Sequence, residues 1–381
     1  MVLTACGSTV PPSGRPSTFV SASGAASAVA ATPTGGATSP SAKPSPVAQP
    51  NVYAAVGRGL APALASLTPR VYVPDEHTGD VAIIDPSTFK VVGHLGTGVY
   101  PEHVTPDWDF SRLYVSNMSS STLTVLDPAN ARATGVIHVP TPYDVYFSPN
   151  GAMAVVVNDY ISPANLRLNG LWFYDRSTWR KIGWLEIPWP GADDLDFSAD
   201  GTFLLVSCEY SGMVAKVDLR SRRVVASARV GGLPRDVRLA PDGREFLVTN
   251  ESLGGVSVVD ASSLRITRFI RTGAGAHGLE FTHDGRQVYV NNRSAGTITV
   301  IDVDSWQVVA TWKVGGSPDE TVLSPDGSQL WISNRYHGGV SVVDTRTGKV
   351  VARIATGEDP HGILYWPLPG RYATGQNGNM R

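Results

Sequence analysis

The sequence has little cysteine and almost no net charge. Its 381 residues include two cysteines, Cys6 and Cys208, so no disulfide can form within the part of the chain that follows residue 6. Lys and Arg together number 31 against 33 Asp and Glu, which gives a formal charge of −2 at pH 7. Nucleic-acid binding usually requires a strongly basic face, and we therefore expect no nucleic-acid partner.

Several catalytic and nucleotide-binding motifs are also missing. The sequence contains no GxSxG, HExxH or P-loop motif. Residues 273–278, GAGAHG, match GxGxxG, but they open a predicted strand rather than a strand-to-helix turn, which argues against dinucleotide binding. Cys208 ends the apolar run LLVSC and is interpreted as a small buried residue rather than a nucleophile.

What the sequence does contain is a repeat of about 42 residues. Its marker is an aspartate that ends an alternating apolar run and precedes a turn such as DPST or DTRT. The seven markers are Asp85, Asp127, Asp175, Asp218, Asp260, Asp302 and Asp344. An aspartate here can accept the backbone N–H two residues on and so close the turn. A period of about 40–45 residues is typical of a propeller blade.

Each repeat contains four short β segments. In residues 277–314 they are HGLEFTH, RQVYVNN, TITVID and WQVVATWKV, rich in β-branched and aromatic residues and separated by polar or Gly-containing turns. Seven such repeats predict an all-β fold, a seven-bladed β-propeller of four-stranded antiparallel blades. The first repeat lacks an innermost strand. We predict that residues 361–366 supply it beside residues 70–74 and close the ring.

The repeats resemble a known family. Segments such as LYVSN…LTVLD and VYVNN…ITVID are similar to the YVTN/YncE-like β-propellers over about residues 69–370, and the run from GAHGL through WPLPGRY to GNMR resembles secreted or lipid-anchored actinobacterial members. The resemblance implies an extracytoplasmic seven-bladed propeller. Relatives of this architecture include lactonases and the propeller domains of periplasmic redox enzymes. The chain has no CxxCH haem motif and no cupredoxin-like cluster, which argues against electron transfer.

The N-terminal 52 residues differ in composition from the rest. LTAC, residues 3–6, resembles a bacterial lipobox, so residues 1–6 are expected to be a truncated signal remnant with Cys6 as the lipidation site. Residues 7–52 are rich in Ser, Thr, Ala, Gly and Pro, which favours a disordered tether between the lipid anchor and a propeller over residues 53–381. This predicts an extracytoplasmic protein that contacts the membrane only through its lipid. The alternative is a disordered tail with a chance cysteine.

The candidate site residues lie at the starts of the predicted innermost strands, which surround the mouth of the central channel. The candidate metal ligands are His103, His277 and His361. The candidate ligand-binding residues, some from neighbouring turns, are Asp144, Asp194, Arg235, Asp236, Glu320, Arg293 and Arg335, with Glu102, Asp193 and Asp319 beside them. Imidazole with carboxylate suits Zn²⁺, and carboxylate with backbone oxygen suits Ca²⁺. The alternative is a set of polar residues around a water-filled channel with no ligand.

The strand period also predicts how the histidines are oriented. Successive residues on a strand point to opposite faces. We therefore expect His277 and His361 to be oriented alike and His103, one position later in its repeat, to point elsewhere. A metal site is then expected from His277 and His361 with Asp236 or Glu320.

The third repeat is longer than its neighbours. The extra residues fall within 159–170, between its second and third strands, and should lie near residues 184–194. A lid or contact loop on the mouth face is one interpretation, since functional loops gather on one face of repeat folds. The other is that Trp172, Trp184 and Trp189 simply pack between blades.

Two functions are compatible with these observations. The first is a binding or scaffold module that presents its mouth to a small ligand or a protein. The second is a metal-assisted hydrolase of lactonase-like type, in which the ion polarises a carbonyl or activates water. The first is favoured because no lactonase motif can be matched residue by residue, and no catalytic residue is assigned.

Overall fold

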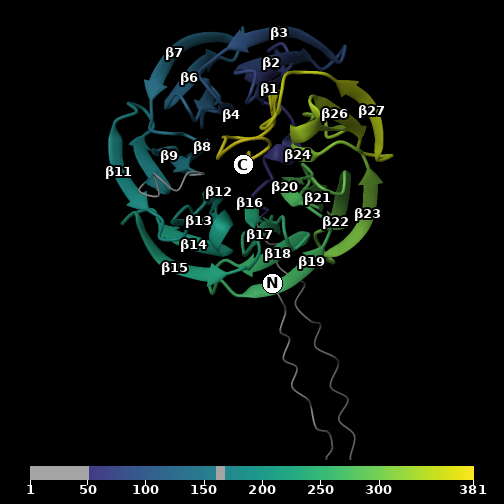
Figure 1. The fold of residues 1–381 in the computed structure, drawn as a ribbon. Helices are drawn as coiled ribbons and strands as arrows, with labels where there is room; N and C mark the ends of the chain where they lie inside the picture. Colours follow the sequence, from purple (N-terminus) through teal and green to yellow (C-terminus); the bar gives the residue numbers. More distant parts are fainter. Residues whose placement is uncertain (1–50, 160–167) are drawn as a thin grey trace, which may run out of the picture. The chain divides into compact units, whose positions relative to one another are not determined.

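The structure is a computed structural model that describes residues 51–159 and 168–381. Within these ranges, seven four-stranded antiparallel sheets are arranged around a central axis (Figure 1). The predicted seven-bladed propeller is therefore confirmed. Cys6, nearly all of the expected tether and residues 160–167 of the insertion lie outside the described residues. The described part of the chain contains no helix long and apolar enough to cross a membrane.

Six blades are each built from four consecutive strands. In chain order the strands are β4 (Pro101–Pro106), β5 (Leu113–Asn117), β6 (Thr122–Asp127), β7 (Arg132–His138); β8 (Asp144–Phe147), β9 (Met153–Asn158), β10 (Gly170–Asp175), β11 (Lys181–Glu186); β12 (Ala192–Phe197), β13 (Phe203–Cys208), β14 (Met213–Asp218), β15 (Arg223–Arg229); β16 (Pro234–Leu239), β17 (Glu245–Asn250), β18 (Gly255–Asp260), β19 (Ile266–Arg271); β20 (Ala276–Phe281), β21 (Gln287–Asn292), β22 (Thr297–Asp302), β23 (Gln307–Lys313); and β24 (Pro318–Leu323), β25 (Gln329–Asn334), β26 (Val340–Asp344), β27 (Lys349–Ile354). The described helical turns are η1 (Val56–Arg58), α1 (Pro62–Ala65), η3 (Glu209–Ser211) and η4 (Arg335–His337).

The seventh blade joins both ends of the propeller. It contains β28 (Leu364–Trp366), β1 (Arg70–Asp75), β2 (Asp80–Asp85) and β3 (Lys90–Gly96), in that order. Trp366 pairs with Arg70 and Leu364 with Tyr72, and the His361 N–H donates to the Pro74 carbonyl at 3.0 Å. The predicted closure is therefore confirmed.

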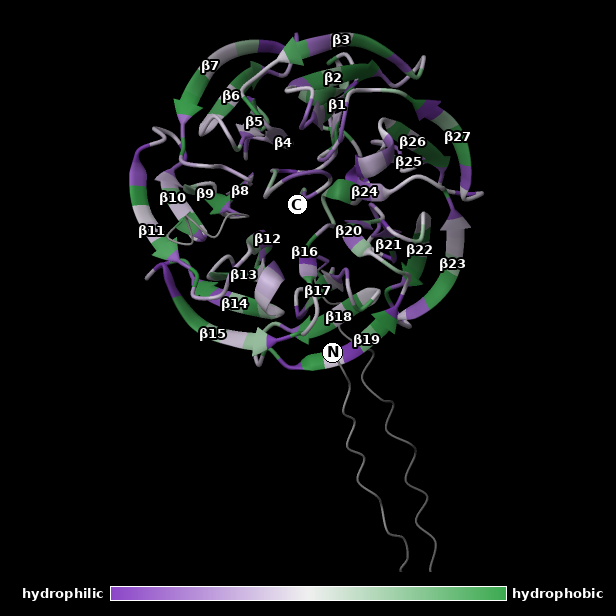
Figure 2. Ribbon diagram, in the orientation of Figure 1, coloured by the Kyte–Doolittle hydropathy of each residue, from purple (hydrophilic) through white to green (hydrophobic). Residues whose placement is uncertain are grey.

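The position of a strand in its blade determines its hydropathy pattern. The second strand of a blade has a strand on each side within its sheet and a neighbouring blade on each face. In β1, the second strand of the closing blade, Val71, Tyr72 and Val73 are therefore all fully buried. The outermost strands have one face toward solvent, and alternate residues of β3 are exposed. Figure 2 shows this alternation as stripes on the outermost strands. Sheet edges with this pattern keep the hydrophobic face inward and expose charged residues.

The marker aspartates close the turn between the third and fourth strands of each blade. Asp85 and Asp127 accept the N–H two residues on, at 2.9 Å each. The other five accept the N–H three residues on, as Asp260 does from Ser263 at 2.7 Å. Hydrogen bonds from Ser263 and Ser262 lower the pKa of Asp260 to about 2. The repeat marker is thus a turn cap.

The C-terminal residues enter the central channel as a hairpin (Figure 1). Ala373 pairs with Met380, and the N–H and hydroxyl of Thr374 donate hydrogen bonds to the carbonyl of Asn379. Gly375, near the tip, approaches the ring of Tyr146 on an innermost strand. We call residues 373–381 the channel hairpin. Because it fills the axis, the polar residues of the innermost strands are buried by protein rather than exposed to a water-filled channel.

The first described residues pack on the face opposite the mouth. Asn51 and Val52, which the sequence placed in the tether, hydrogen-bond to Asp284 O and Pro241 O at 3.2 and 2.8 Å. The Tyr53 hydroxyl donates to Leu239 O at 2.7 Å. This segment therefore belongs to the folded propeller.

Candidate functional site

A β-bulge at the start of the innermost strand directs two consecutive side chains toward the axis. In β4, Glu102 and His103 together oppose the single residue Ser116. The same irregularity occurs in four other blades, so that the bulged pairs are Glu102–His103, Asp193–Asp194, Arg235–Asp236, His277–Gly278 and Asp319–Glu320. Bulges change the direction of side chains and often lie near functional sites. In four of the five blades both residues of the pair are polar or charged, whereas in the fifth Gly278 follows His277.

The three histidines lie together. The ring centroids of His103 and His361 are 4.6 Å apart, and those of His277 and His361 are 6.5 Å apart. The expectation that His103 points away from the others is wrong, because the bulge breaks the strict alternation on which it depended. His103 also packs edge-on against Tyr143 at 5.1 Å, and neither of its ring nitrogens has a hydrogen-bond partner among the described residues.

Carboxylates surround His361 and His277. The Nδ1 atom of His361 lies 2.6 Å from Glu102 Oε2 and 3.2 Å from Glu76 Oε1. The Nδ1 atom of His277 lies 3.1 Å from Glu320 Oε1 and 3.6 Å from Asp319 Oδ1. Glu320, one of the two carboxylates expected as a metal ligand with these histidines, therefore lies next to His277. His361 instead contacts Glu76 and Glu102.

Three arginines form the layer above the histidines. Arg335 pairs with Glu76 at 2.5 Å, and Arg293 pairs closely with Asp319. Arg235 contacts Glu209 at 2.5 Å and Glu251 at 2.8 Å. All three predicted arginines thus reach the mouth, and each is already bound to a carboxylate.

The remaining predicted residues lie deeper in the channel. Asp194 accepts hydrogen bonds from the Tyr146 hydroxyl at 2.6 Å and from Gln376 of the channel hairpin at 2.8 Å. Asp144 accepts from the Thr105 hydroxyl at 3.0 Å. Asp236 accepts the Leu279 N–H at 2.8 Å and contacts Arg238 at 3.4 Å, so it belongs to this layer and not to the histidine cluster.

Burial shifts the protonation of these groups. It lowers the pKa of His103 to about 3 and holds those of His277 and His361 well below the usual range, so all three rings are neutral at pH 7. Burial, reinforced by the charge of Glu76, raises the pKa of Glu102. Such shifts are typical of functional sites, although structural ion-pair networks produce them too.

Three acidic residues at the mouth, Glu76, Glu209 and Glu251, were not predicted. Each follows the last residue of the second strand of its blade. The same position holds Asp159, Arg293 and Arg335, so six of seven repeats carry a charge there. The charged position is therefore visible when the repeats are aligned, but only Arg293 and Arg335 were predicted from it.

Glycine follows two of the histidines because the chain is crowded there. A Cβ atom on Gly362 would lie 2.7 Å from His103 Nδ1 and 2.8 Å from the Glu102 carbonyl. A Cβ atom on Gly278 would lie 2.7 Å from the Asp319 carbonyl. The His-Gly pairs therefore allow neighbouring blades to approach closely.

The described part of the insertion contacts the segment predicted to adjoin it. Asn169 donates to Ile187 O and Trp189 O and accepts the N–H groups of Gly191 and Ala192, at 2.7 to 3.0 Å. A lid at residues 160–167 lies outside the described residues.

Trp172 and Cys208 pack in the interior of the fold, whereas Trp184 and Trp189 are half-buried. Trp172 and Trp184 pair across adjacent strands, with ring centroids 4.3 Å apart. Cys208 is buried, and burial raises the pKa of its thiol to about 12, as expected of an unreactive residue.

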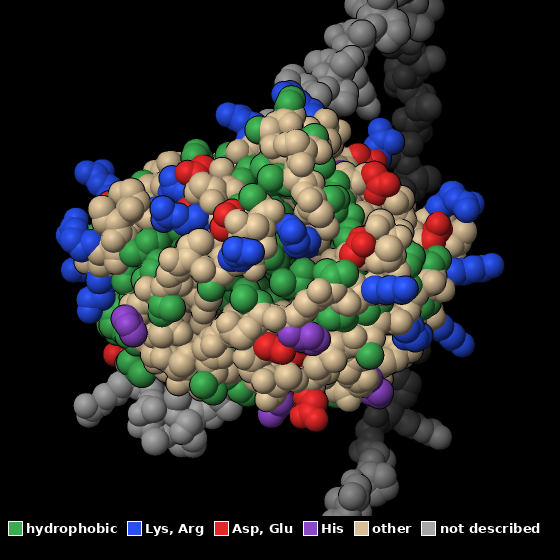
Figure 3. Space-filling model, turned by 90° about the horizontal axis from the view of Figure 1, so that it is seen from above, with side chains coloured by type: hydrophobic (Ala, Val, Ile, Leu, Met, Phe, Trp, Pro, Cys, Tyr) green, Lys and Arg blue, Asp and Glu red, His purple; other side chains and the backbone are tan. Residues whose placement is uncertain are grey.

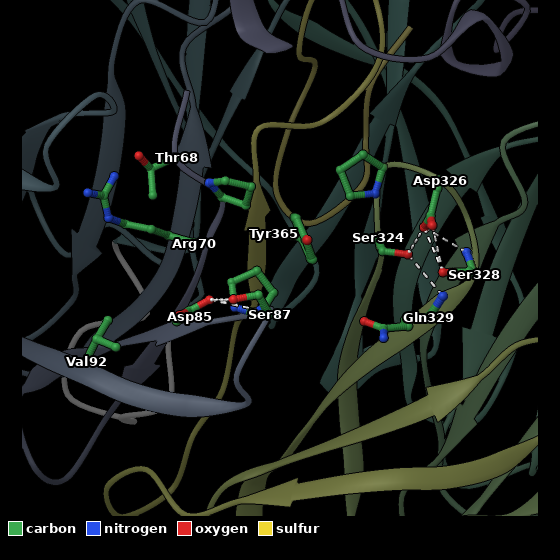
Figure 4. A pocket seen from close by; sticks show the side chains of 13 residues that line it. Thr68, Arg70, Asp85, Ser87, Val92, Ser324, Asp326, Ser328, Gln329 and Tyr365 are labelled. Atoms are coloured by element: carbon green, nitrogen blue, oxygen red, sulfur yellow. Dashed lines mark hydrogen bonds between the residues drawn. The ribbon is translucent and has the colours of Figure 1, made fainter. Parts of the chain in front are cut away.

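A separate groove of about 670 Å³ lies on the face opposite the mouth, between β24–β27 and the closing blade (Figure 4). Arg70, Tyr365, Asp85 and Asp326 line it. Both carboxylates already bind neighbouring turn residues, and none of the predicted site residues lines the groove. On the side of the propeller seen in Figure 3, Lys and Arg side chains lie among Asp and Glu side chains.

A model of the YNCE-like β-propeller family matches residues 38–369. Among solved structures, Kuenenia stuttgartiensis hydrazine synthase is similar with a TM-score of 0.63 and 21% identity, over 72% of this chain and 92% of that chain. A functionally unknown protein from Desulfotomaculum acetoxidans has a TM-score of 0.67 and 18% identity, over 78% and 98%. The dihydro-heme d1 dehydrogenase NirN has 0.58 and 17%, over 77% and 74%. These likenesses show the fold alone. No curated protein matches the sequence.

Proposed function

Since the chain belongs to the YNCE-like β-propeller family, we propose that it is an extracytoplasmic, lipid-anchored module that binds a partner through the mouth face of its propeller. The LTAC sequence that ends at Cys6 and the Ser/Pro/Ala-rich residues 7–52 support the anchor and the tether. Among the described residues, several exposed apolar side chains lie on the mouth face.

The observation that carries the proposal is a set of exposed apolar side chains around the arginine layer. Val99, Tyr210, Leu253 and Tyr336 are 62, 48, 43 and 61% exposed, and all four lie in crossovers or turns of the mouth face. The other large exposed apolar side chains of the described residues lie singly or in pairs on the outermost strands. Tyrosine and arginine are enriched at protein interfaces, where aromatic side chains act as anchors.

The spread of these side chains indicates the size of the partner. They come from three different blades and one crossover between blades, so a single occupant that touches them all must span the mouth. A protein surface or peptide does this and a small solute does not. Arg235 and Arg335, although paired with carboxylates, keep 17% of their side chains exposed and Glu251 keeps 21%, so groups of both signs face such a partner.

Site-specific photocrosslinking in the native host tests the proposal. A photoreactive residue is placed at Tyr210 or Tyr336, and, as the matched control, at Val225 or Val351, which are similarly exposed on outermost strands. We expect a discrete adduct of the same partner from both mouth positions and none from the controls. Absence of adducts, or identical adducts from all four positions, would contradict mouth-face binding.

A metal-assisted hydrolase of lactonase-like type is the second candidate. Its support is that ligand atoms of Glu76, Glu102 and His361 lie within 4.8 Å of one another, and that Asp319, whose Oδ2 lies 3.6 Å from His361 Nε2, could act as a base. These groups are buried, which favours binding over turnover. Acid release from lactones of several ring sizes, dependent on added metal and lost in Asp319→Asn, would establish the hydrolase; no release would leave the binding module.

A further inference from the structure

We infer that Glu76, Glu102 and His361 form a binding site for one divalent first-row transition metal ion, with Zn²⁺ as the best match. The inference goes beyond partner binding, because the ion would be a structural part of the ring where its two ends meet. It requires no partner and no catalysis.

The first argument is geometric. Glu76 follows β1, Glu102 lies in β4 and His361 precedes β28, so the three ligands join the closing blade to its neighbour. One ligand atom from each lies within 4.8 Å of the others. Tetrahedral zinc places its ligand atoms about 3.4 Å apart. The distances from His361 Nδ1, 2.6 Å to Glu102 and 3.2 Å to Glu76, therefore need shifts of less than about 1 Å.

The second argument concerns charge. Ion pairs and His–carboxylate contacts link the described residues of the mouth into one network. Its cations are Arg235, Arg293 and Arg335. The carboxylates of the same network are Glu76, Glu102, Asp193, Glu209, Glu251, Asp319 and Glu320. Buried charges require opposite charges or metal ions nearby. A divalent cation offsets part of this excess of carboxylates over arginines.

The third argument is the lack of hydrogen-bond partners for buried nitrogen atoms. Both ring nitrogens of His103 are buried and have no hydrogen-bond partner among the described residues. A buried polar atom left in this state costs about 1–3 kcal/mol. A zinc ion with three protein ligands has a fourth position for water. A water there, beside the neighbouring His103 ring, supplies a partner of the kind that this ring lacks.

The donor set selects the metal. One imidazole nitrogen with two carboxylates suits zinc and its first-row neighbours, whereas Ca²⁺ requires six to eight oxygen ligands. Arg335 holds Glu76 at 2.5 Å, as outer partners of ligating carboxylates commonly do. The equivalent His277 lacks such a set among the described residues, because its ligand atoms and those of Asp319 and Glu320 do not form a group that lies within 4.8 Å of one another.

Elemental analysis of the tag-free full chain tests the inference. The protein is stripped with a chelator, incubated for long periods with zinc sulfate because the site is buried, and separated from free metal. We expect about one zinc per chain in the wild type, and affinity weakened at least about 10-fold in Glu102→Gln and His361→Gln. His277→Gln is the matched control, since His277 occupies the same repeat position, and it should keep its zinc.

A measurement on the wild type alone guards against variants that fail to fold. Co²⁺ in place of zinc should give the strong visible absorption of a low-symmetry site with a nitrogen ligand. Lack of stoichiometric zinc in the wild type, retention of zinc by His361→Gln, or equal loss in His277→Gln would each overturn the inference. Crosslinking at Tyr210 and Tyr336 involves none of the three ligands, so failure of partner binding and failure of the metal site remain distinguishable.

Discussion

Replacing Arg381 by methionine should destabilise the whole propeller, although the residue lies at the very end of the channel hairpin. Its guanidinium is buried and donates to Asp196 Oδ1 and to Phe197 O, both at 2.7 Å. Breaking one partner of a buried ion pair costs roughly 3–5 kcal/mol, because the other charge is left uncompensated.

The structure places the expected loss at the lower end of that range. Asp196 keeps two backbone donors after the change, the N–H of Phe197 at 2.7 Å and that of Leu239 at 2.8 Å. Methionine also fills most of the volume of the arginine stem, so little cavity is created. We therefore expect the free energy of unfolding to fall by about 3 kcal/mol.

Equilibrium urea unfolding, followed by tryptophan fluorescence, measures this loss. Trp108 is a suitable probe because its ring stacks on Tyr372, beside the channel hairpin, at 5.4 Å. Arg371→Met is the matched control, since Arg371 is exposed in the same terminal segment and should change stability by less than about 0.5 kcal/mol. If Arg381→Met behaves like the control, the hairpin does not stabilise the ring and the reasoning is refuted.

Three further predictions concern other layers of the molecule. Burial raises the pKa of Glu280 to about 8, against the usual 4.5, despite the opposing charge of Arg238. Between these values the folded protein keeps a proton that the unfolded chain has released, so wild-type stability falls as pH rises through this window. Glu280→Gln removes this titration. As pH rises through the window, the unfolding free energy of the variant should therefore fall less steeply than that of the wild type, with slopes that differ by up to about 1.4 kcal/mol per pH unit. Parallel pH profiles would contradict this. Gly362→Ala should cost about 1–3 kcal/mol through overpacking at the histidine cluster, whereas Gly93→Ala, with no atom within 4 Å of the added Cβ, should not, as thermal unfolding of both would show. Finally, expressed with its natural upstream sequence, the wild type should partition into the detergent phase of an extraction and Cys6→Ala into the aqueous phase; equal partitioning would exclude the lipid anchor.

The blades could be predicted from the sequence because a local rule repeats in every one. Each marker aspartate caps the same turn, and the apolar runs before it form the same strand, so period and strand order follow from neighbours in the chain. The closing blade followed as well, since one repeat lacked a strand and residues 361–366 matched it.

The packing of the site could not be predicted in the same way. A bulge in β20 or β4 depends on hydrogen bonding to the next strand, so residue alternation gave the wrong orientation for His103. The channel hairpin carries no apolar pattern, and its polar residues find partners only among buried groups such as Asp194. Glu76 occupies the same repeat position as Arg293 and Arg335, but only the arginines were predicted from that position.

The joint between β28 and β1 has a consequence for how the protein folds. The innermost edge of β1 is paired only when residues about 290 positions later arrive, so ring closure has very high contact order and must be the last and slowest step. During synthesis, and during export if the protein is secreted, six blades can form one after another while this edge stays open. An unpaired strand edge is a template for association with other chains. The nascent propeller is therefore most vulnerable to aggregation just before residues 364–366 are added.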